Sequence, residues 1–264
     1  MPESSVANCN ICGAKTSVLF QAMILGKHDV SFHRCASCKF IQTDTPFWLE
    51  ESYSSAISTL DVGLVARNVH FSKVCTTLIE KYYPQDERFL DYGGGYGLFV
   101  RLMRDSGFDF YWHDEYCENI FARYFEYSLE DSGNKFELIT AFEVMEHLPN
   151  PMETLTKILS LGDSFLFSTH LQPEKEIHSA DDWWYFLPDT GQHLSFYTTK
   201  TMVTIAEKFG MKYYSDGSSL HLFTRLDIDE NDLKVKRHTS DGKSLLQNDA
   251  EIAKLKLPNF ISEL

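Results

Sequence analysis

The stretch FLDYGGGYGLF, residues 89–99, has glycine at four of five consecutive positions directly after an apolar run that ends in Asp91. Glycine lets a ligand approach the backbone without meeting a Cβ atom. A dinucleotide-binding fingerprint would need Gly or Ala at position 98, which is Leu98 here, and a phosphate-binding P-loop would need a lysine, which the stretch lacks. What remains is an acidic residue followed by glycines at alternate positions. A carboxylate at the end of a strand can attract an ammonium group, directly or through water.

A second carboxylate, Asp114, ends the next strand-like segment, 23 residues after Asp91. In doubly wound folds, a carboxylate at this place accepts hydrogen bonds from the hydroxyls of an adenosine ribose. Two alternatives stay open. Asp114 could cap a helix instead, and the neighbouring Glu115 could bind the ribose, although strand alternation directs Glu115 away from the crevice. We expect Asp114 to contact a ribose.

Four of the six cysteines form two CxxC pairs, Cys9 with Cys12 and Cys35 with Cys38, and 22 residues separate the pairs. Two such pairs supply the four thiolates of a tetrahedral zinc site, and four protein ligands leave no open position for catalysis. We therefore predict a structural zinc ion in a ribbon-like module. Redox-active or metal-free cysteines are the alternative.

Segments with strand and helix spacing alternate through the rest of the chain. Strands are predicted at 88–93, 108–114, 136–144, 163–170, 211–217 and 219–226. Helices are predicted at 63–81, 97–107, 118–125, 151–161 and 198–210, and a short one near 248–255. This order indicates an α/β fold with a doubly wound, mostly parallel sheet, which we expect to have seven strands and to end in an antiparallel hairpin.

The same patterns divide the chain into four regions. We expect a zinc-ribbon-like module at 1–45, a connector with a lead-in helix at 46–84, a ligand-binding domain at 85–226 and a charged extension at 227–264.

Two motifs of the large domain resemble those of the class I methyltransferases that use S-adenosylmethionine. The first is the acidic and glycine-rich turn from Asp91 to Gly97, and the second is FELITAFEVMEHLPNP, residues 136–151, similar to a fourth-strand signature that often reads EVLEHLPDP. The resemblance covers about residues 85–225. The double CxxC segment is similar to the zinc-binding module that precedes some of these enzymes, notably sugar C-methyltransferases.

The resemblance implies that S-adenosylmethionine is the cofactor, with its methionine part against the glycines and beside Asp91. Phe142 and Glu143 would flank that part, and Arg67 would pair with its carboxylate, or else be a solvated helix arginine. The full set of expected cofactor residues is Asp91, Gly93, Gly94, Gly95, Asp114, Phe142, Glu143 and Arg67.

Two histidines are the candidate catalytic residues. His147 follows the EVMEHL motif and could act as a general base or cap a backbone carbonyl, and His193 lies in a loop that we expect to face the acceptor. The aromatic segment 183–186 could form a wall of the acceptor site or a plug between the loop and the domain.

The net charge of −14 repels phosphate backbones and anionic membranes, so we expect neither nucleic acid nor a membrane as a partner. The N-terminus lacks the features of a signal peptide, which favours a cytoplasmic protein. We predict an enzyme that methylates a small molecule such as a sugar, a nucleotide-linked sugar or another secondary metabolite. The alternative is an inactive methyltransferase-like binding or assembly module anchored by its zinc site.

Overall fold

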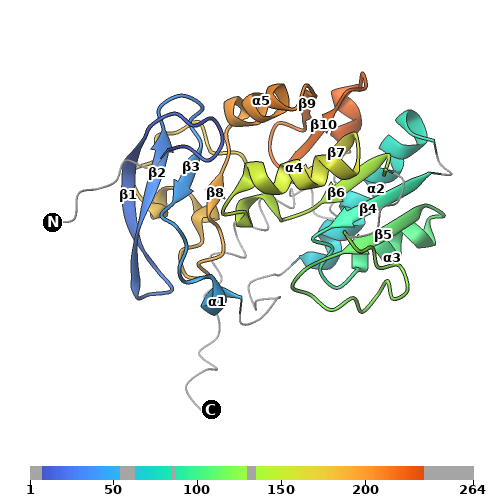
Figure 1. The fold of residues 1–264 in the computed structure, drawn as a ribbon, viewed down its shortest axis with the longest axis horizontal. Coiled ribbons are helices and arrows are strands. Elements are labelled where there is room, and N and C mark those ends of the chain that lie inside the picture. Colours follow the sequence, from blue (N-terminus) through green and yellow to red (C-terminus); the bar gives the residue numbers. More distant parts are fainter. Residues whose placement is uncertain (1–7, 54–62, 85–86, 130–134, 235–264) are drawn as a thin grey trace, which may run out of the picture.

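The computed structural model describes residues 8–53, 63–84, 87–129 and 135–234, which form two sheets with helices around the larger one (Figure 1). The helix predicted near 248–255 lies outside the described residues.

The larger sheet has the strand order β5-β4-β6-β7-β10-β9. Its parallel strands are β4 (Arg88–Tyr92), β5 (Asp109–His113), β6 (Leu138–Ala141) and β7 (Ser164–Ser168). Strands β9 (Lys212–Ser215) and β10 (Leu220–Thr224) form an antiparallel hairpin, and β10 also pairs antiparallel with β7. The predicted mostly parallel sheet with a final antiparallel hairpin is confirmed.

In the described part of the chain the larger sheet has six strands, and only an isolated bridge lies where a seventh strand would pair with β5. Beyond β5, Trp112 pairs with Glu126 in an isolated parallel bridge. The Trp112 N–H donates to the Phe125 carbonyl at 2.8 Å, and the Tyr127 N–H donates to the Trp112 carbonyl at 2.7 Å. The edge of β5 is therefore covered by a bridge, at a place where the sequence predicted no strand.

The helix predicted at 118–125 is wrong, because these residues form turns and bends. The Asn119 side chain accepts a hydrogen bond from the Ala122 N–H at 2.9 Å and donates one to the Ala122 carbonyl at 2.7 Å. Local bonds of this kind compete with helical hydrogen bonds. Tyr124 then takes a left-handed conformation with φ of 73°, which no helix continues through.

Helices cover both faces of the larger sheet. Successive strand residues point to opposite faces, so that Phe89 and Leu90 of β4 enter two different cores. The Phe89 core contains α2 (Leu64–Tyr82) and α3 (Leu98–Asp105), and the Leu90 core contains α4 (Pro151–Leu161) and α5 (Thr199–Lys208). None of the helices in the described ranges has both the length and the apolar character needed to cross a membrane.

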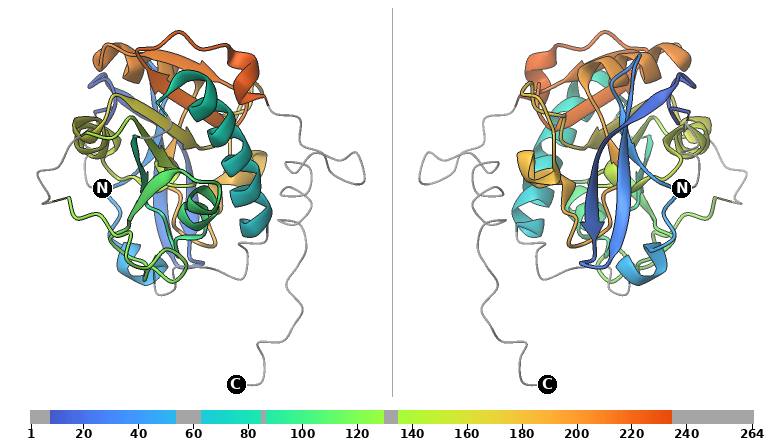
Figure 2. Two further views of the ribbon diagram at one scale, coloured as in Figure 1. Left: turned by 90° about the vertical axis from the view of Figure 1, so that its right-hand side faces the viewer. Right: turned by 90° about the vertical axis from the view of Figure 1, so that its left-hand side faces the viewer.

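The smaller sheet is antiparallel and has the order β1-β2-β3-β8. Strands β1 (Thr16–Ile24), β2 (His28–Cys35) and β3 (Ile41–Thr43) precede the short helix α1 (Leu49–Ser52), but β8 is Ser195–Phe196. The right-hand view of Figure 2 shows β1 and β2 in front of the larger sheet. Strand β8, from the region 85–226, thus completes the sheet of the N-terminal region. The two regions therefore share this sheet.

Candidate active site

A cavity of about 1440 Å³ opens at the carboxyl ends of β4, β5 and β6. Ligands of doubly wound folds bind at this edge of the sheet. All residues that the sequence predicted for the cofactor or for catalysis line the cavity, namely Arg67, Asp91, Gly93, Gly94, Gly95, Asp114, Phe142, Glu143, His147 and His193. The volume exceeds the roughly 300–1,000 Å³ of a typical small-molecule site, so a cofactor and an acceptor can fit together.

Two glycines of the turn are required by their protein neighbours rather than by a ligand. A Cβ on Gly93 would lie 2.6 Å from Cγ2 of Val144, and a Cβ on Gly94 would lie 2.7 Å from Cδ1 of Trp112. Gly95 differs, since a Cβ there would meet no atom within 4 Å, while its φ of 54° still favours glycine. Gly95 is therefore the position at which the backbone faces open space.

Asp91 lies beneath this turn and is only 3% exposed. Its Oδ1 accepts a hydrogen bond from the Thr140 hydroxyl on β6 at 2.6 Å. Burial is the main reason why the pKa of Asp91 rises to about 7, and the nearby charge of Asp114 adds to the rise. A carboxylate in this condition gains most from a cationic partner, because such a partner offsets the cost of the buried charge.

Asp114 ties the glycine turn to the loop that follows β5. Its Oδ2 accepts from the Gly95 N–H at 2.9 Å, and its Oδ1 accepts from the N–H groups of Tyr116 and Cys117 at 2.7 and 2.8 Å. Asp114 therefore caps the turn at 114–117, and the residues directly after this turn are not helical. Glu115 also lines the cavity, although we expected it to face away.

Phe142 and Glu143 continue the cavity wall after β6. The Phe142 ring stacks on Phe71 of α2, with centroids 4.2 Å apart and planes at 11°. Glu143 has a left-handed φ of 56°, and its Oε1 accepts from the Ser168 hydroxyl at 2.6 Å while its N–H donates to the same hydroxyl oxygen at 2.7 Å. Such a backbone conformation costs about 1–3 kcal/mol in a residue with a side chain and is typical of functional sites.

The two histidines lie close together in the cavity wall, with ring centroids 4.9 Å apart. His193 is buried, and its Nδ1 lies 2.7 Å from the Tyr185 carbonyl oxygen. Burial, followed by the neighbouring His147, lowers the pKa of His193 well below its usual value. His193 is thus a neutral imidazole at neutral pH. The Nδ1 of His147 lies 3.1 Å from the Gln192 carbonyl oxygen and 3.0 Å from the Tyr53 hydroxyl.

Sequence reasoning missed Glu146, which is 0% exposed and has a carboxylate oxygen within 4.8 Å of a ring nitrogen of each histidine. Burial and then the charge of Glu143 raise the pKa of Glu146 to about 8. Among the described residues, neither carboxylate oxygen meets strict hydrogen-bond geometry, although the hydroxyls of Tyr185 and Thr169 lie close enough to oppose part of this rise. The available signal was its place beside His147 in the EVMEHL motif, yet a glutamate on a short turn would ordinarily be solvated.

The aromatic segment 183–186 contributes both to a hydrophobic plug and to the wall of the cavity. Trp183 and Phe186 are buried with Phe32 and Phe196 of the smaller sheet and act as the plug. Trp184, which is half-buried, lines the cavity together with Tyr185.

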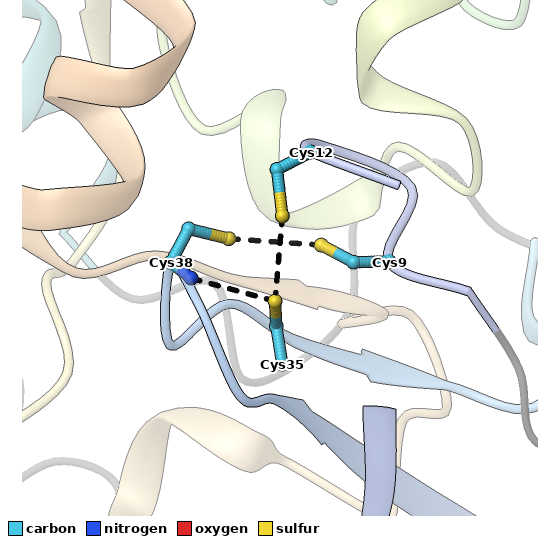
Figure 3. A group of neighbouring side chains, drawn as sticks. All are labelled: Cys9, Cys12, Cys35 and Cys38. Carbon is cyan, nitrogen blue, oxygen red and sulfur yellow. Dashed lines mark hydrogen bonds between the residues drawn. The ribbon is translucent and has the colours of Figure 1, made fainter. Parts of the chain in front are cut away.

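A cluster of four cysteines lies apart from the cavity, where the turn between β2 and β3 meets the N-terminal turn (Figure 3). The Sγ atoms of Cys9 and Cys38 are 3.6 Å apart, those of Cys12 and Cys35 are 3.4 Å apart, and all four lie within 4.8 Å of one another. Four sulfurs at about 2.3 Å around one zinc ion would be roughly 3.8 Å apart. The distances between the four sulfurs therefore fit a tetrahedral zinc site.

The backbone near the cluster has the geometry of two metal-binding turns. The Ile11 N–H donates to the Cys9 sulfur and the Cys38 N–H donates to the Cys35 sulfur, each at 3.4 Å. Such bonds orient thiolates and stabilise their charge.

Helices on both faces of a mostly parallel sheet, with a glycine-rich turn after its first strand and carboxylates at neighbouring strand ends, define the Rossmann-like fold of the class I methyltransferases. The chain belongs to the methyltransferase domain family, whose sequence model matches residues 66–215, more than half of the chain. No curated protein matches the chain.

Solved structures similar to this chain are also methyltransferases by name. CalO1, a methyltransferase in calicheamicin biosynthesis in its SAH-bound form, is 11% identical, with 61% of this chain and 54% of CalO1 covered and a TM-score of 0.43. The plantazolicin methyltransferase BpumL in complex with SAH is 11% identical, with 67% and 93% covered and a TM-score of 0.49. Magnesium protoporphyrin IX methyltransferase from Synechocystis PCC 6803 with bound SAH is 12% identical, with 67% and 95% covered and a TM-score of 0.43. This chain spans just over half the length of CalO1.

Proposed function

We propose that this chain binds S-adenosylmethionine in the cavity above β4, β5 and β6, and transfers its methyl group to a small-molecule acceptor such as a sugar, a nucleotide-linked sugar or another secondary metabolite. The observation that carries the proposal is the position of two carboxylates at neighbouring strand ends. Asp91 lies under the glycine turn, and Asp114 is bonded to the turn through Gly95, on the wall of one cavity.

Each predicted cofactor residue has a role in this proposal. The Asp91 carboxylate attracts the ammonium group of the methionine part, which passes over the open face at Gly95, and the Arg67 guanidinium pairs with the methionine carboxylate. Asp114 binds the ribose hydroxyls with the acceptor capacity that its three backbone bonds leave. Phe142 and Glu143 flank the methionine part from β6.

The acceptor occupies the part of the cavity lined by His147, His193 and Trp184. The sulfonium already activates the methyl group, so the main task of these residues is to place the acceptor atom in line with the sulfur–carbon bond. Orientation alone can supply about 7–11 kcal/mol of a reaction barrier.

We also propose that the four cysteines hold a structural zinc ion. Their sulfurs fit a closed tetrahedral site, and zinc there would supply folding energy and no chemistry of reaction.

Asp114 gives the direct test of the cofactor site. We expect Asp114→Ala to weaken S-adenosylmethionine binding by roughly 100-fold in calorimetric titration, since a hydrogen bond to a charged group contributes about 1.5–3 kcal/mol. Asp114→Asn, which keeps one acceptor oxygen for the loop, should lose less affinity. The matched control is Asp105→Ala on the exposed end of α3, which should bind like the wild type. No binding by the wild-type protein would refute the proposal and would favour the inactive binding module.

The pH dependence of cofactor affinity should follow Asp91. Its pKa of about 7 means that the carboxylate is mostly protonated at pH 6, so affinity is expected to be about tenfold lower there than at its maximum. Affinity should fall again above about pH 8, as the amino group of the cofactor loses its proton. Titrations from pH 5.5 to 9 in buffers of different ionisation enthalpy would measure the protons exchanged. In Asp91→Asn the acidic limb should disappear, and an unchanged acidic limb would contradict the assignment.

A further inference from the structure

The donor atoms of Glu146, His147 and His193 converge from two segments of the chain. Glu146 and His147 belong to the short 3₁₀ helix Met145–His147 after β6, and His193 lies in the loop before β8. One ligand atom from each of the three residues lies within 4.8 Å of the other two. All three residues line the cavity that we assign to the cofactor and acceptor.

The Nδ1 atom of each ring is held by a hydrogen bond. The Nδ1 of His193 faces the Tyr185 carbonyl, and the Nδ1 of His147 faces the Gln192 carbonyl. A carbonyl oxygen only accepts, so the Nδ1 of His193 donates and its Nε2 carries a lone pair. The Nδ1 of His147 also lies 3.0 Å from the Tyr53 hydroxyl, and its Nε2 faces Glu146. This is the arrangement in which proteins hold metal-binding histidines: one ring nitrogen is anchored to a backbone oxygen and the other is basic.

Glu146 supplies the second, independent observation. It is fully buried, and its Oε1 is 3.9 Å from the Nε2 of His147. The hydroxyls of Tyr185 and Thr169 lie nearby, but none of the described residues gives either carboxylate oxygen a hydrogen bond of good geometry. A buried carboxylate whose neighbours are neutral hydroxyls and imidazoles is costly, and a cation bound between the three side chains would offset that cost.

We propose that Glu146, His147 and His193 bind a first-row divalent transition-metal ion at the acceptor end of the cavity. Two imidazoles and one carboxylate suit ions such as Mn²⁺, Fe²⁺, Co²⁺ or Zn²⁺ better than Ca²⁺ or Mg²⁺, which prefer all-oxygen ligands. Three protein ligands on one side leave the remaining coordination positions open towards the cavity.

The open positions also define the class of acceptor, and this second part rests on the proposed methyltransferase function. An oxygen atom of the acceptor would bind the ion, which would fix its position and lower the pKa of an acceptor hydroxyl. The hydroxyl proton then passes to water, the oxygen takes the methyl group, and the electron pair of the broken carbon–sulfur bond stays on sulfur. An oxygen-bearing acceptor is therefore expected in preference to a simple amine.

The test uses the full chain with its cysteine site loaded with zinc, and Mn²⁺ as the probe. Paramagnetic resonance should detect one bound Mn²⁺ per chain with nitrogen couplings from imidazole. Glu146→Gln is nearly isosteric and should weaken Mn²⁺ binding at least about tenfold, as should His193→Gln. The matched control is Glu176→Gln, because Glu176 lies 3.4 Å from His178 on the exposed surface and should not contribute.

Melting curves and S-adenosylmethionine titrations on the same samples distinguish a failure of the metal site from a failure of the proposed function. Mn²⁺ should raise the melting temperature of the wild type and of Glu176→Gln, but not that of Glu146→Gln, which should still bind S-adenosylmethionine. The metal site is overturned if Mn²⁺ binds wild type and Glu146→Gln equally, or if no nitrogen coupling is found. A protein that binds Mn²⁺ at this site but no S-adenosylmethionine would instead refute the proposed function and leave the metal site standing.

Discussion

Removal of zinc, or the substitution Cys35→Ser, is expected to cost this protein most of its stability. Zinc binding to four thiolates is coupled to folding by about 10–16 kcal/mol in small zinc domains, and a whole protein is stable by only about 5–15 kcal/mol. Metal analysis should find one zinc ion per wild-type chain. Thermal unfolding in a strong chelator should show a loss of the N-terminal sheet at a much lower temperature.

The loss should extend beyond the cluster, because the cysteine turns are bonded to the large domain. The Cys38 carbonyl accepts from the hydroxyls of Thr198 and Thr201 at the start of α5, at 3.1 and 2.9 Å. The Lys208 ammonium at the end of the same helix donates to the Ile11 carbonyl at 2.8 Å. The loop with His193 leads into β8, which pairs with β3, so cofactor binding should weaken as well.

Cys117→Ser is the matched control, since Cys117 is half-buried and outside the cluster. It should keep both the zinc content and the stability of the wild type. A purified wild-type protein without zinc, and with the same melting temperature in chelator, would show that the cysteines are held by packing alone.

Substitution of Asp91 should have the largest effect on the cofactor site. Truncation of one partner of a buried charge pair costs about 2–5 kcal/mol, so Asp91→Asn should weaken S-adenosylmethionine binding by about 30-fold to several thousand-fold at pH 8. The amide oxygen can still accept from Thr140, so the site should keep its shape. Calorimetric titration measures the affinity, and Asp105→Asn on α3 is the control.

Asp91→Asn is expected to lower the affinity for the cofactor but to raise the free energy of unfolding of the cofactor-free protein at pH 8. The folded-state pKa of Asp91 is raised from its usual 3.8 to about 7, so the unfolded chain releases this proton first as the pH rises. The free energy of unfolding of the wild type should therefore fall between about pH 4 and pH 7 and then level off. Asp91→Asn lacks this decline and should be more stable than wild type at pH 8. Loss of stability together with binding would identify Asp91 as a structural residue only.

Elements with a strong local signal were predicted well from the sequence. The helix predicted at 151–161 is α4 with the same ends, because Pro151 suits the first turn of a helix and Gly162 follows its last residue. The final hairpin follows from the turn at Gly217 between two apolar segments. The segment 118–125 failed because the Asn119 side chain bonds to the local backbone, a competition that helical periodicity does not reveal.

The sequence by itself determined the order of the strands in the larger sheet and of helices α2 to α5, the two CxxC pairs and the carboxylates at the strand ends, since these depend on spacing along the chain. Only the tertiary structure decided that Gly93 and Gly94 are required by Val144 and Trp112. It also decided that β8 completes the N-terminal sheet and that Glu146 is buried close to two histidines. Contacts of this kind join residues far apart in the chain. The burial and pKa of a side chain depend on what packs around it, which no local pattern specifies.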